Sequence, residues 1–538
     1  MFSRVISAAV YGIDAYIVNV ETDVGFGLPT FDMSGALGSK VREAKDRVRV
    51  AIKNSGIELT PQKIVINISP ANIRKEGTIY DLPIAIGILA ANGCFDLKIL
   101  ENVLIIGEVS LDGSINPVKG VLPMVCAAKE AGIDNCIIPK ANIAEGRIMN
   151  NINIYGVETL SQTIEILKNI AVIDGSRKNI KQADVKSGEC NKSDGNINND
   201  TYNVLERSRV KFTYGSEVKN NNHSCSYNID YSDISGQEAA KRATMIAVSG
   251  MHNIMYIGPP GSGKTMLAQR IPTIMPDMDY EEQLRLLDSE GGIMVKRPFR
   301  NPHHTITQAA LLGGGAVPRP GEITLSEGGV LFLDEMTEFN QVIMEALRQP
   351  LEDKVITLVR VNAAYTYPAH FMLAAAINPC KCGYYPDRNR CHCSEYDIRR
   401  YIGRISNPMW DRFDMCVKVD EVSYEVMRNK GNVDTIYNST DMKNKVEAAR
   451  QMQKDRFKKL DINYNSQMGV REIHKYCTLN VECNELMERM YKQHHMSARA
   501  YNKVLKTART IADLKGSVNI EKEHLTEALF YKNCEVKS

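Results

Sequence analysis

Residues 258–265 read GPPGSGKT, which matches the pattern G-x-x-x-x-G-K-[ST] of loops that hold phosphate groups. An apolar run at 254–257 precedes the loop, and a helical pattern at 266–271 follows it. Glycines let the backbone curl so that successive N–H groups point inward, and the positive end of the next helix adds to their attraction for anions. The predicted phosphate-loop contacts are Gly258, Pro259, Pro260, Gly261, Ser262, Gly263, Lys264 and Thr265.

A second stretch, VLFLDE at 330–335, predicts a buried strand that ends in two carboxylates. With a loop of this type, Lys264 is expected to reach the β- and γ-phosphates, and the Thr265 hydroxyl to hold Mg²⁺. Asp334 is expected to position the same ion, and Glu335 to act as the base that polarises a water molecule. The two stretches together predict ATP hydrolysis, with ATP and Mg²⁺ as cofactors.

Length and composition limit the class of protein. A chain of 538 residues is too long for one core, so three or more domains are expected. A net charge of +2 gives no general attraction for polyanions, so any nucleic-acid surface must be local. No apolar run is long enough to span a membrane, no signal-peptide cleavage pattern follows the first methionine, and the thirteen cysteines are an odd number. These features predict a cytoplasmic protein with reduced thiols and no membrane partner.

The pattern along the chain predicts four segments. Residues 1–171 alternate short strand and helix patterns, as in an α/β domain. Residues 172–228 are rich in Asn, Ser, Lys and Asp and are predicted to be a flexible linker. Residues 229–420 carry the motifs, and 421–538 are mainly helical. The clearest elements are strands at 16–20 and 64–68 and helices at 40–54, 82–91, 237–249 and 497–514.

The order of the motifs resembles the AAA+ ATPases, specifically the magnesium-chelatase-like branch that contains the YifB/ComM family. The resemblance covers essentially the whole chain, from a Lon-protease-like α/β domain through an AAA+ α/β core to an all-helical lid. Its most specific stretches are RPFRNPHHTIT at 297–307, PRPGEITLSEGGVLFLDE at 318–335, AAAINPCKCGYY at 374–385 and RRYIGRISNPMWDRFD at 399–414.

The resemblance implies further site residues. Asn378 takes the sensor-1 role, which orients the attacking water together with Glu335. Arg412, in WDRFD, matches the arginine finger given to a neighbouring subunit, and Arg499, in SARA, matches the sensor-2 arginine of the lid. The alternative for both arginines is a surface salt bridge. Ile234 and Gln237, in the ISGQ that precedes the loop, are expected to contact the nucleotide. Such sites are completed between subunits, so a homo-oligomeric ring, most often a hexamer, is implied.

Two insertions are expected to face a substrate. Residues 354–361 and 365–367 predict a β-hairpin, and the resemblance places such a hairpin in the ring pore. Lys354, Arg360 and Tyr365 are the candidate DNA contacts, expected to be exposed and to bind phosphates by charge and bases by stacking. The segment 291–321 resembles a second pore insertion, and a solvated loop is the alternative. The role of His303 and His304 within it stays open.

Four thiols lie within fourteen positions, at Cys380, Cys382, Cys391 and Cys393. Four thiolates can close a tetrahedral structural Zn²⁺ site, although the C-x-C spacing is tighter than the usual one. Free thiols, or a redox or iron–sulfur role, are the alternatives.

The N-terminal region resembles the Lon-type protease domain at 107–121 and 127–142. Peptidase activity of that type needs a serine and a lysine within hydrogen-bond reach. The stretch KEGTIYD at 75–81 holds no serine where the resemblance requires one, and Thr78 and Lys119 are displaced from the matching positions. A noncatalytic domain is therefore expected.

Three functions remain. The first is a ring motor that drives branch migration of single-stranded or branched DNA in recombination or natural transformation. The second is the motor subunit of a magnesium chelatase, and the third an ATP-dependent protein unfoldase or protease. The Lon-like domain and the cysteine insertion favour the first function, and the missing Ser/Lys pair argues against the third. The link to DNA rests on the resemblance alone.

Overall fold

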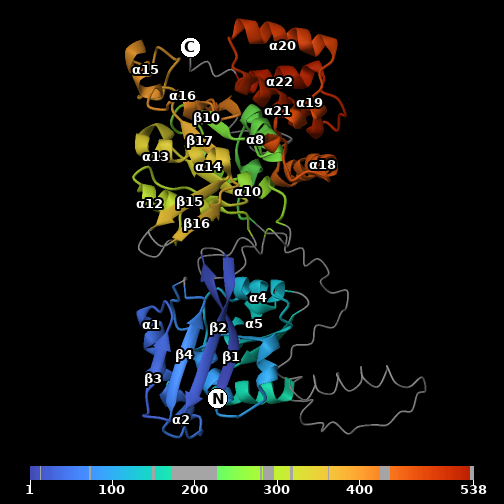
Figure 1. Cartoon of the computed structure of the whole chain (residues 1–538). Helices are drawn as coiled ribbons and strands as arrows, with labels where there is room; N and C mark the ends of the chain where they lie inside the picture. The colour runs from blue at the N-terminus through green and yellow to red at the C-terminus, as the bar shows by residue number, and fades with distance from the viewer. Residues whose placement is uncertain are drawn as a thin grey trace, which may run out of the picture. The chain divides into compact units, whose positions relative to one another are not determined.

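The computed structural model describes residues 1–11, 14–71, 74–147, 149, 152–170, 227–278, 282, 296–314, 319–360, 363–424 and 437–532. The chain divides into two compact units, whose described parts are 1–170 and 227–532 (Figure 1). The predicted linker, 172–228, lies outside the described residues except for its last two positions.

A seven-stranded mixed sheet forms the centre of the N-terminal unit, in the order β3-β4-β2-β1-β5-β8-β9. β1 and β2 form a long antiparallel hairpin, and β5, β8 and β9 extend the sheet in parallel. Buried and less buried positions alternate along β4, as expected for a strand with one face on the core. The strands are β1 (Phe2–Tyr11), β2 (Asp14–Gly25), β3 (Phe31–Ser34), β4 (Lys63–Ser69), β5 (Val103–Ile105), β8 (Asn135–Pro139) and β9 (Asn153–Val157).

Helices cover this sheet and enclose two hydrophobic clusters. Residues of α2 (Ala44–Asn54) and α3 (Asp81–Ala91) belong to one cluster, and residues of α4 (Val121–Glu130) to the other. Every residue of α3 is buried, so its apolar sequence reflects a helix enclosed on all sides. The smaller elements are α1 (Ser39–Arg42), η1 (Leu97–Asn102), β6 (Glu108–Val109), β7 (Ile115–Asn116), η2 (Lys140–Asn142) and α5 (Ile143–Gly146).

A five-stranded, fully parallel sheet forms the centre of the second unit, in the order β11-β14-β17-β10-β18. Its three inner strands are buried at every position, which explains why they appear in the sequence as continuous apolar runs. The strands are β11 (Phe299–Arg300), β14 (Val330–Leu333), β17 (Met372–Ile377), β10 (Ile254–Ile257) and β18 (Met415–Lys418).

Short helices and two hairpins surround this sheet. The predicted hairpin is confirmed as β15 (Val355–Arg360) paired with β16 (Ala363–Pro368), and β12 (Gly313–Gly314) pairs with β13 (Arg319–Pro320). The helices are η3 (Tyr231–Asp233), α8 (Glu238–Gly250), α9 (Lys264–Gln269), α10 (Ile271–Ile274), α12 (Gln308–Leu312), η4 (Thr324–Ser326), η5 (Met336–Glu338), α13 (Gln341–Ala346), α14 (Arg348–Asp353), α15 (Glu395–Ile402) and α16 (Asn407–Trp410).

The described residues from 437 onward are helical, as predicted, and form the lid. Ser497 caps α21, because its hydroxyl accepts a hydrogen bond from the Ala500 N–H at 3.1 Å. Val504, Ala508 and Ile511 are buried in the same hydrophobic cluster as the parallel sheet, so the lid and the sheet share one core. The lid helices are α18 (Ser439–Phe457), η6 (Asn465–Gln467), α19 (Val470–Tyr476), α20 (Val481–Gln493), α21 (Ala498–Leu514) and α22 (Lys522–Lys532).

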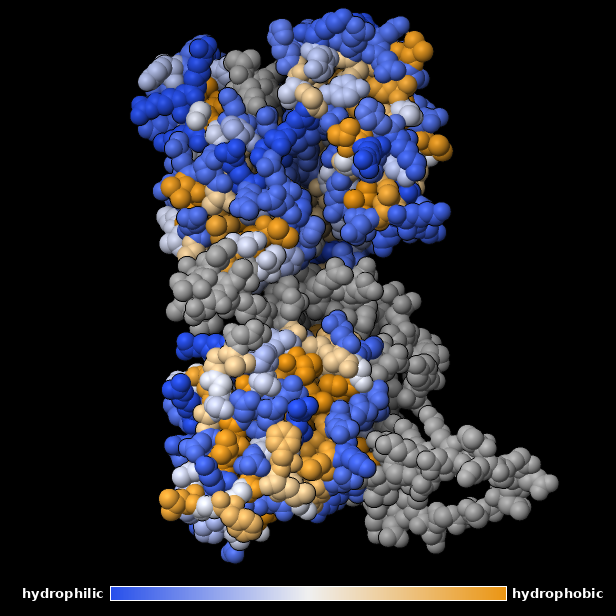
Figure 2. All heavy atoms as spheres, in the orientation of Figure 1, coloured by the Kyte–Doolittle hydropathy of each residue, from blue (hydrophilic) through white to orange (hydrophobic). Residues whose placement is uncertain are grey.

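The surface differs between the two units. Hydrophilic residues cover most of the visible face of the C-terminal unit, whereas hydrophobic patches interrupt that of the N-terminal unit (Figure 2). Phe26 and Leu28, just after β2, are both strongly exposed. Among the described residues, none of the helices has the length and apolar character needed to cross a membrane.

Candidate nucleotide-binding site

Three neighbouring strands end at one edge of the parallel sheet. β10 ends at Ile257, β14 at Leu333 and β17 at Ile377, and β17 pairs with both of the others. Because the strands are parallel, the residues that follow them meet at their carboxyl ends, where open α/β sheets place their ligands. The phosphate loop, Asp334 and Asn378 are therefore brought together although the sequence separates them widely.

The loop after β10 has the backbone that its glycines predict. Gly261 and Gly263 have φ angles of +78° and +92°, in the left-handed region that favours glycine. A Cβ atom on Gly258 would lie 2.1 Å from the carbonyl oxygen of Val419, so this position has no room for a side chain. Lys264 then begins α9. The predicted succession of strand, loop and helix is confirmed.

The Lys264 ammonium group is folded back into the loop. Its Nζ atom donates hydrogen bonds to the carbonyl oxygens of Gly258 at 2.8 Å and Pro259 at 2.7 Å, and to Asn378 Oδ1 at 3.1 Å. Burial lowers the pKa of Lys264 to about 8, and the charges of Asp334 and Glu335 act in the opposite direction. A buried ammonium with so little compensation is stabilised by an anionic ligand.

Thr265 and Asp334 face each other across the site. The Thr265 hydroxyl donates a hydrogen bond to Asp334 Oδ2 at 2.8 Å, so the two predicted Mg²⁺ ligands lie at one point. Both supply hard oxygen atoms, which suit Mg²⁺. Glu335 follows with a φ of +49°, uncommon for a residue with a side chain, and it is exposed. The structure thus separates a carboxylate directed at Thr265 from one open to water.

Gln237 is the second contact between the loop and an earlier segment. Its Nε2 atom donates to the carbonyl oxygens of Ser262 at 3.3 Å and Asp420 at 2.5 Å. Ile234 is buried in the hydrophobic core, and its carbonyl oxygen accepts a hydrogen bond from Lys241 Nζ. Asp420 is a residue that sequence reasoning missed, because it acts through its backbone carbonyl and side-chain patterns carry no signal for that.

Arg412 and Arg499 come together at one carboxylate. The Nη2 atom of each lies 2.6 Å from Glu352 Oε1. Arg412 is 8% exposed and Arg499 is 53% exposed. Burial lowers the pKa of Arg412, and the negative charge of Glu352 partly offsets this. Both arginines therefore form the ion pair that was the alternative to a catalytic role, with a shared partner on α14 that no sequence motif indicated.

Asp414, two residues after Arg412, fixes this segment to the lid. Its carboxylate lies 2.8 Å from Lys503 Nζ on α21 and accepts a hydrogen bond from the Asn253 N–H at 3.0 Å. Burial opposes ionisation, but Lys503 and His252 hold the pKa of Asp414 well below its ordinary value. The sequence WDRFD thus carries an anchoring carboxylate as well as the arginine.

The hairpin residues differ from expectation at Lys354. Lys354 caps the end of α14 with a φ of +58° and is half-buried, so the expected exposed side chain at the start of the hairpin is wrong. Burial lowers its pKa, and the charges of Asp414 and Lys503 also act on it. The strand pattern did not show that α14 runs up to this residue. The backbones of Arg360 and Tyr365 lie in β15 and β16, and their side chains are outside the described part.

The two histidines of the other insertion contact each other, with ring centroids 4.1 Å apart. His303 Nδ1 lies 2.9 Å from Thr305 Oγ1, which fixes the turn ahead of α12. Parts of the segment 291–321 lie outside the described residues.

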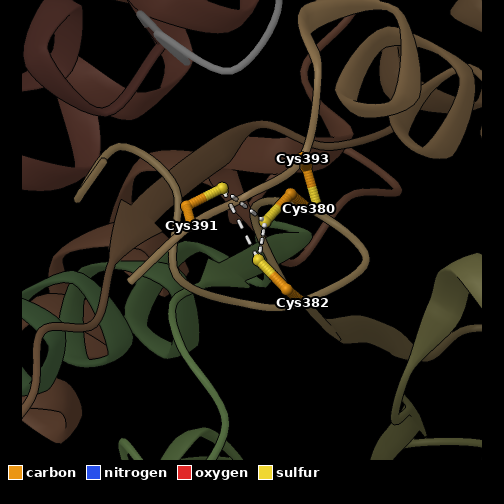
Figure 3. Close-up of side chains that lie close together, drawn as sticks. All are labelled: Cys380, Cys382, Cys391 and Cys393. Carbon is orange, nitrogen blue, oxygen red and sulfur yellow. Dashed lines mark hydrogen bonds between the residues drawn. The ribbon is translucent and has the colours of Figure 1, made fainter. Parts of the chain in front are cut away.

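The four cysteines converge, as Figure 3 shows, with their side chains pointing toward one another. Their sulfur atoms all lie within 4.8 Å of one another. Cys380 Sγ is 3.3 Å from that of Cys382 and 3.7 Å from that of Cys391. The group can therefore surround a single metal ion.

In the N-terminal unit, the Thr78 hydroxyl donates a hydrogen bond to Glu108, and Lys119 is exposed. A hydroxyl bonded to a carboxylate is not paired with a lysine base, which agrees with the expectation of a noncatalytic domain.

The fold and site together define a P-loop protein of AAA+ architecture, with a Lon-like α/β unit ahead of it and a helical lid after its sheet. Family models match in three places. The model described as "Magnesium chelatase, subunit ChlI" matches residues 230–427, "Subunit ChlI of Mg-chelatase" matches 20–142, and "Magnesium chelatase, subunit ChlI C-terminal" matches 437–532.

Relatives match along the whole chain. Competence protein ComM of Haemophilus influenzae is 36% identical over 536 residues, 98% of this chain and 97% of that protein. YifB of Escherichia coli is 36% identical, with 98% and 97% covered. An archaeal Lon protease of Thermococcus kodakarensis is 31% identical over 151 residues, 27% of this chain and 23% of that protein. The chain belongs to the YifB/ComM family of magnesium-chelatase-like AAA+ proteins.

Proposed function

We propose that this chain binds ATP and Mg²⁺ and hydrolyses the γ-phosphate bond. The observation that carries the proposal is the joined network of Lys264 with Asn378 and Thr265 with Asp334, at the edge where three strands end. Glu335 stands beside this network, exposed to water and able to act as a base. Lys264 and the loop N–H groups bind the phosphates, Thr265 and Asp334 hold the ion that offsets their charge, and Asn378 and Glu335 orient the attacking water.

The active form in this proposal is a homo-oligomeric ring, most often a hexamer. Arg412 and Arg499 share Glu352, so two cations are already held against one anionic group. The γ-phosphate of a nucleotide bound to a neighbouring subunit would offer a stronger anionic partner than this carboxylate. The pair therefore supplies the finger and sensor-2 charges across a subunit boundary.

The proposed substrate is DNA, which a ring working in the cytoplasm moves along during branch migration in recombination or natural transformation. Support comes from the relative named a competence protein and from the hairpin β15–β16, whose strands include Arg360 and Tyr365. The second candidate is a magnesium-chelatase-type motor or another protein-remodelling ATPase. Three matches to models of magnesium chelatase subunit ChlI favour this alternative.

The rate of ATP hydrolysis with and without DNA tests these two candidates. We expect single-stranded or forked DNA to stimulate hydrolysis, because a translocating motor couples its substrate contacts to turnover. Phosphate release is measured with single-stranded, duplex and forked oligonucleotides at low salt. A chain that hydrolyses ATP but neither binds nor responds to any of the three would favour the protein-remodelling alternative.

The hairpin prediction concerns the salt dependence of DNA binding. Removing both Lys354 and Arg360 should weaken binding and flatten its salt dependence, by about 0.7 in the logarithmic slope for each single-strand phosphate that is no longer neutralised. Most of the change should come from Arg360, because Lys354 is half-buried. Tyr365→Ala should lower single-strand affinity by about 1–3 kcal/mol with little change in slope.

Fluorescence anisotropy over a salt series measures these effects, with Arg471→Ala, an exposed arginine on α19, as the control. Basal hydrolysis should be unchanged in every variant. Unaltered DNA affinity in the Lys354/Arg360 double variant would contradict the assignment of the hairpin.

A further inference from the structure

The four-cysteine loop, residues 380–393, lies outside the residues that bind or hydrolyse the nucleotide in the proposed function. Cys380 and Cys391 are buried, and Cys382 and Cys393 are half-buried. Burying several thiols at one point brings little gain in hydrophobic contact for so short a loop. Their convergence therefore needs another explanation.

The spacing of the sulfur atoms fits one metal ion. Sulfurs bound about 2.3 Å from one Zn²⁺ lie about 3.8 Å apart in a tetrahedron. The pairs Cys380–Cys382, Cys382–Cys391 and Cys380–Cys391 are 3.3, 3.5 and 3.7 Å apart, and all four sulfurs fall within 4.8 Å. An iron–sulfur cluster would hold its cysteines further apart, because each sulfur binds a different iron. Four thiolates around one ion leave no open position, which is typical of a structural zinc site.

The backbone of the loop already has the shape that such a site needs. The Gly383 N–H bonds the carbonyl oxygen of Cys380 at 3.0 Å, and the Cys391 N–H bonds that of Asp387 at 2.8 Å. The Arg388 guanidinium donates to the carbonyl oxygen of Cys393 at 2.8 Å. A zinc ion with four thiolates carries a net negative charge, and the nearby arginine offsets it.

The loop contacts the nucleotide site at its first cysteine pair. Cys380 follows Asn378, whose side-chain oxygen accepts the hydrogen bond from Lys264. Gly383 has a φ of +88°, and a Cβ atom there would lie 2.4 Å from Pro260 Cδ. The backbone of the cysteine loop therefore packs directly on the phosphate-binding loop.

A second contact lies at the other end of the cysteine loop. The Arg390 guanidinium donates two hydrogen bonds to the carboxylate of Glu421, at 2.6 and 2.8 Å. The preceding residue, Asp420, accepts the hydrogen bond from Gln237, which also reaches Ser262. Both ends of the cysteine loop are thus connected to the phosphate-binding loop, one through Pro260 and the other through Gln237.

We propose that Cys380, Cys382, Cys391 and Cys393 bind one Zn²⁺ ion, and that the closed loop clamps the phosphate-binding loop in the shape that binds nucleotide. The coupling rests on the proposed binding of ATP, whereas the metal site stands independently of it. Zinc binding displaces the four thiol protons and involves no electron transfer. Loss of the ion frees the cysteine loop, and Pro260 and Asn378 lose their support.

The test combines metal analysis with nucleotide binding by the full chain. Metal content is determined on protein purified without chelator, and affinity is measured with a fluorescent ATP analogue. We expect one zinc per chain in the unaltered protein. The double variant Cys382→Ser/Cys393→Ser should lose the zinc and bind the analogue at least about tenfold more weakly. Cys94→Ser, which removes a thiol from the N-terminal unit, should change neither quantity.

Gly383→Ala tests the contact without touching a metal ligand. Its new Cβ meets Pro260, so we expect zinc to be retained and affinity for the analogue to fall by about tenfold. Gly132→Ala is the matched control, because Gly132 has a similar φ of +77° and no atom within 4 Å of the added Cβ. Chelation of the unaltered chain followed by zinc should lower and then restore affinity, which separates the effect from a folding defect.

The outcomes separate the two parts of the proposal. Protein without zinc, or with iron in its place, overturns the metal assignment. Zinc-free variants that bind the analogue as tightly as the unaltered chain overturn the clamp. If the unaltered chain carries zinc but does not bind the analogue, the metal site is supported, while the proposed nucleotide binding fails and the coupling with it.

Discussion

Glu335→Gln is expected to bind ATP as the unaltered chain does but to hydrolyse it about 10²- to 10⁴-fold more slowly, the range typical of a lost general base. The amide keeps the size of the side chain and removes its ability to accept a proton. Asp334 and Thr265 stay in place, so Mg²⁺ and nucleotide binding should persist. Binding of a fluorescent ATP analogue and single-turnover hydrolysis measure the two steps separately.

Glu338→Gln is the matched control for this variant. Glu338 is also exposed, lies one turn further on, and pairs with Arg404 at 2.8 Å on the surface. Its turnover should stay within about twofold of the unaltered rate, as expected for an exposed ion pair. Turnover of Glu335→Gln close to the unaltered rate would remove Glu335 from the catalytic role.

Arg412→Ala should reduce hydrolysis about 10³- to 10⁵-fold, the effect typical of an arginine finger, while each subunit still binds ATP. The reason is that Arg412 lies with Arg499 at Glu352, whereas Lys264 and Asn378 bind each other at the phosphate loop. If the arginine serves a neighbouring subunit, the defect can be repaired from outside. Mixing Arg412→Ala with Lys264→Ala, each inactive alone, should restore part of the activity.

In such a mixture some sites combine an intact loop from one subunit with an intact arginine from the next. Sedimentation analysis shows whether both variants still assemble, and Arg404→Ala, an exposed arginine in a surface pair, serves as the control. Absence of recovered hydrolysis in mixed rings that assemble normally would refute the sharing of sites between subunits. An Arg412→Ala chain with normal turnover would refute the finger role itself.

Local pattern was sufficient where the function depends on adjacent residues. The glycines of the loop at 258–265 allow φ angles that other residues avoid, and the apolar run at 330–333 indicates a strand buried on both faces. The same holds for the lid helix after Ser497, where a cap and an apolar face agree. These features follow from short-range geometry, which the order of residues expresses directly.

Pattern failed at Lys354 because a lysine beside a strand suggests an exposed position. Whether that side chain is exposed depends on where α14 ends and on Asp414 and Lys503, which come from segments distant in sequence. Glu352 and the carbonyl oxygen of Asp420 were missed for the same reason. Each acts through a partner that only the folded chain brings near.

The sequence by itself determined the family, the phosphate-binding loop, the paired carboxylates and the presence of four thiols in one short segment. Only the tertiary structure decided that Asn378 reaches Lys264, that Arg412 and Arg499 meet at Glu352, and that the cysteine loop packs on the phosphate loop. The physical reason lies in the parallel sheet. Its strand order brings together the carboxyl ends of strands that are far apart in the chain, and no local periodicity records which ends become neighbours.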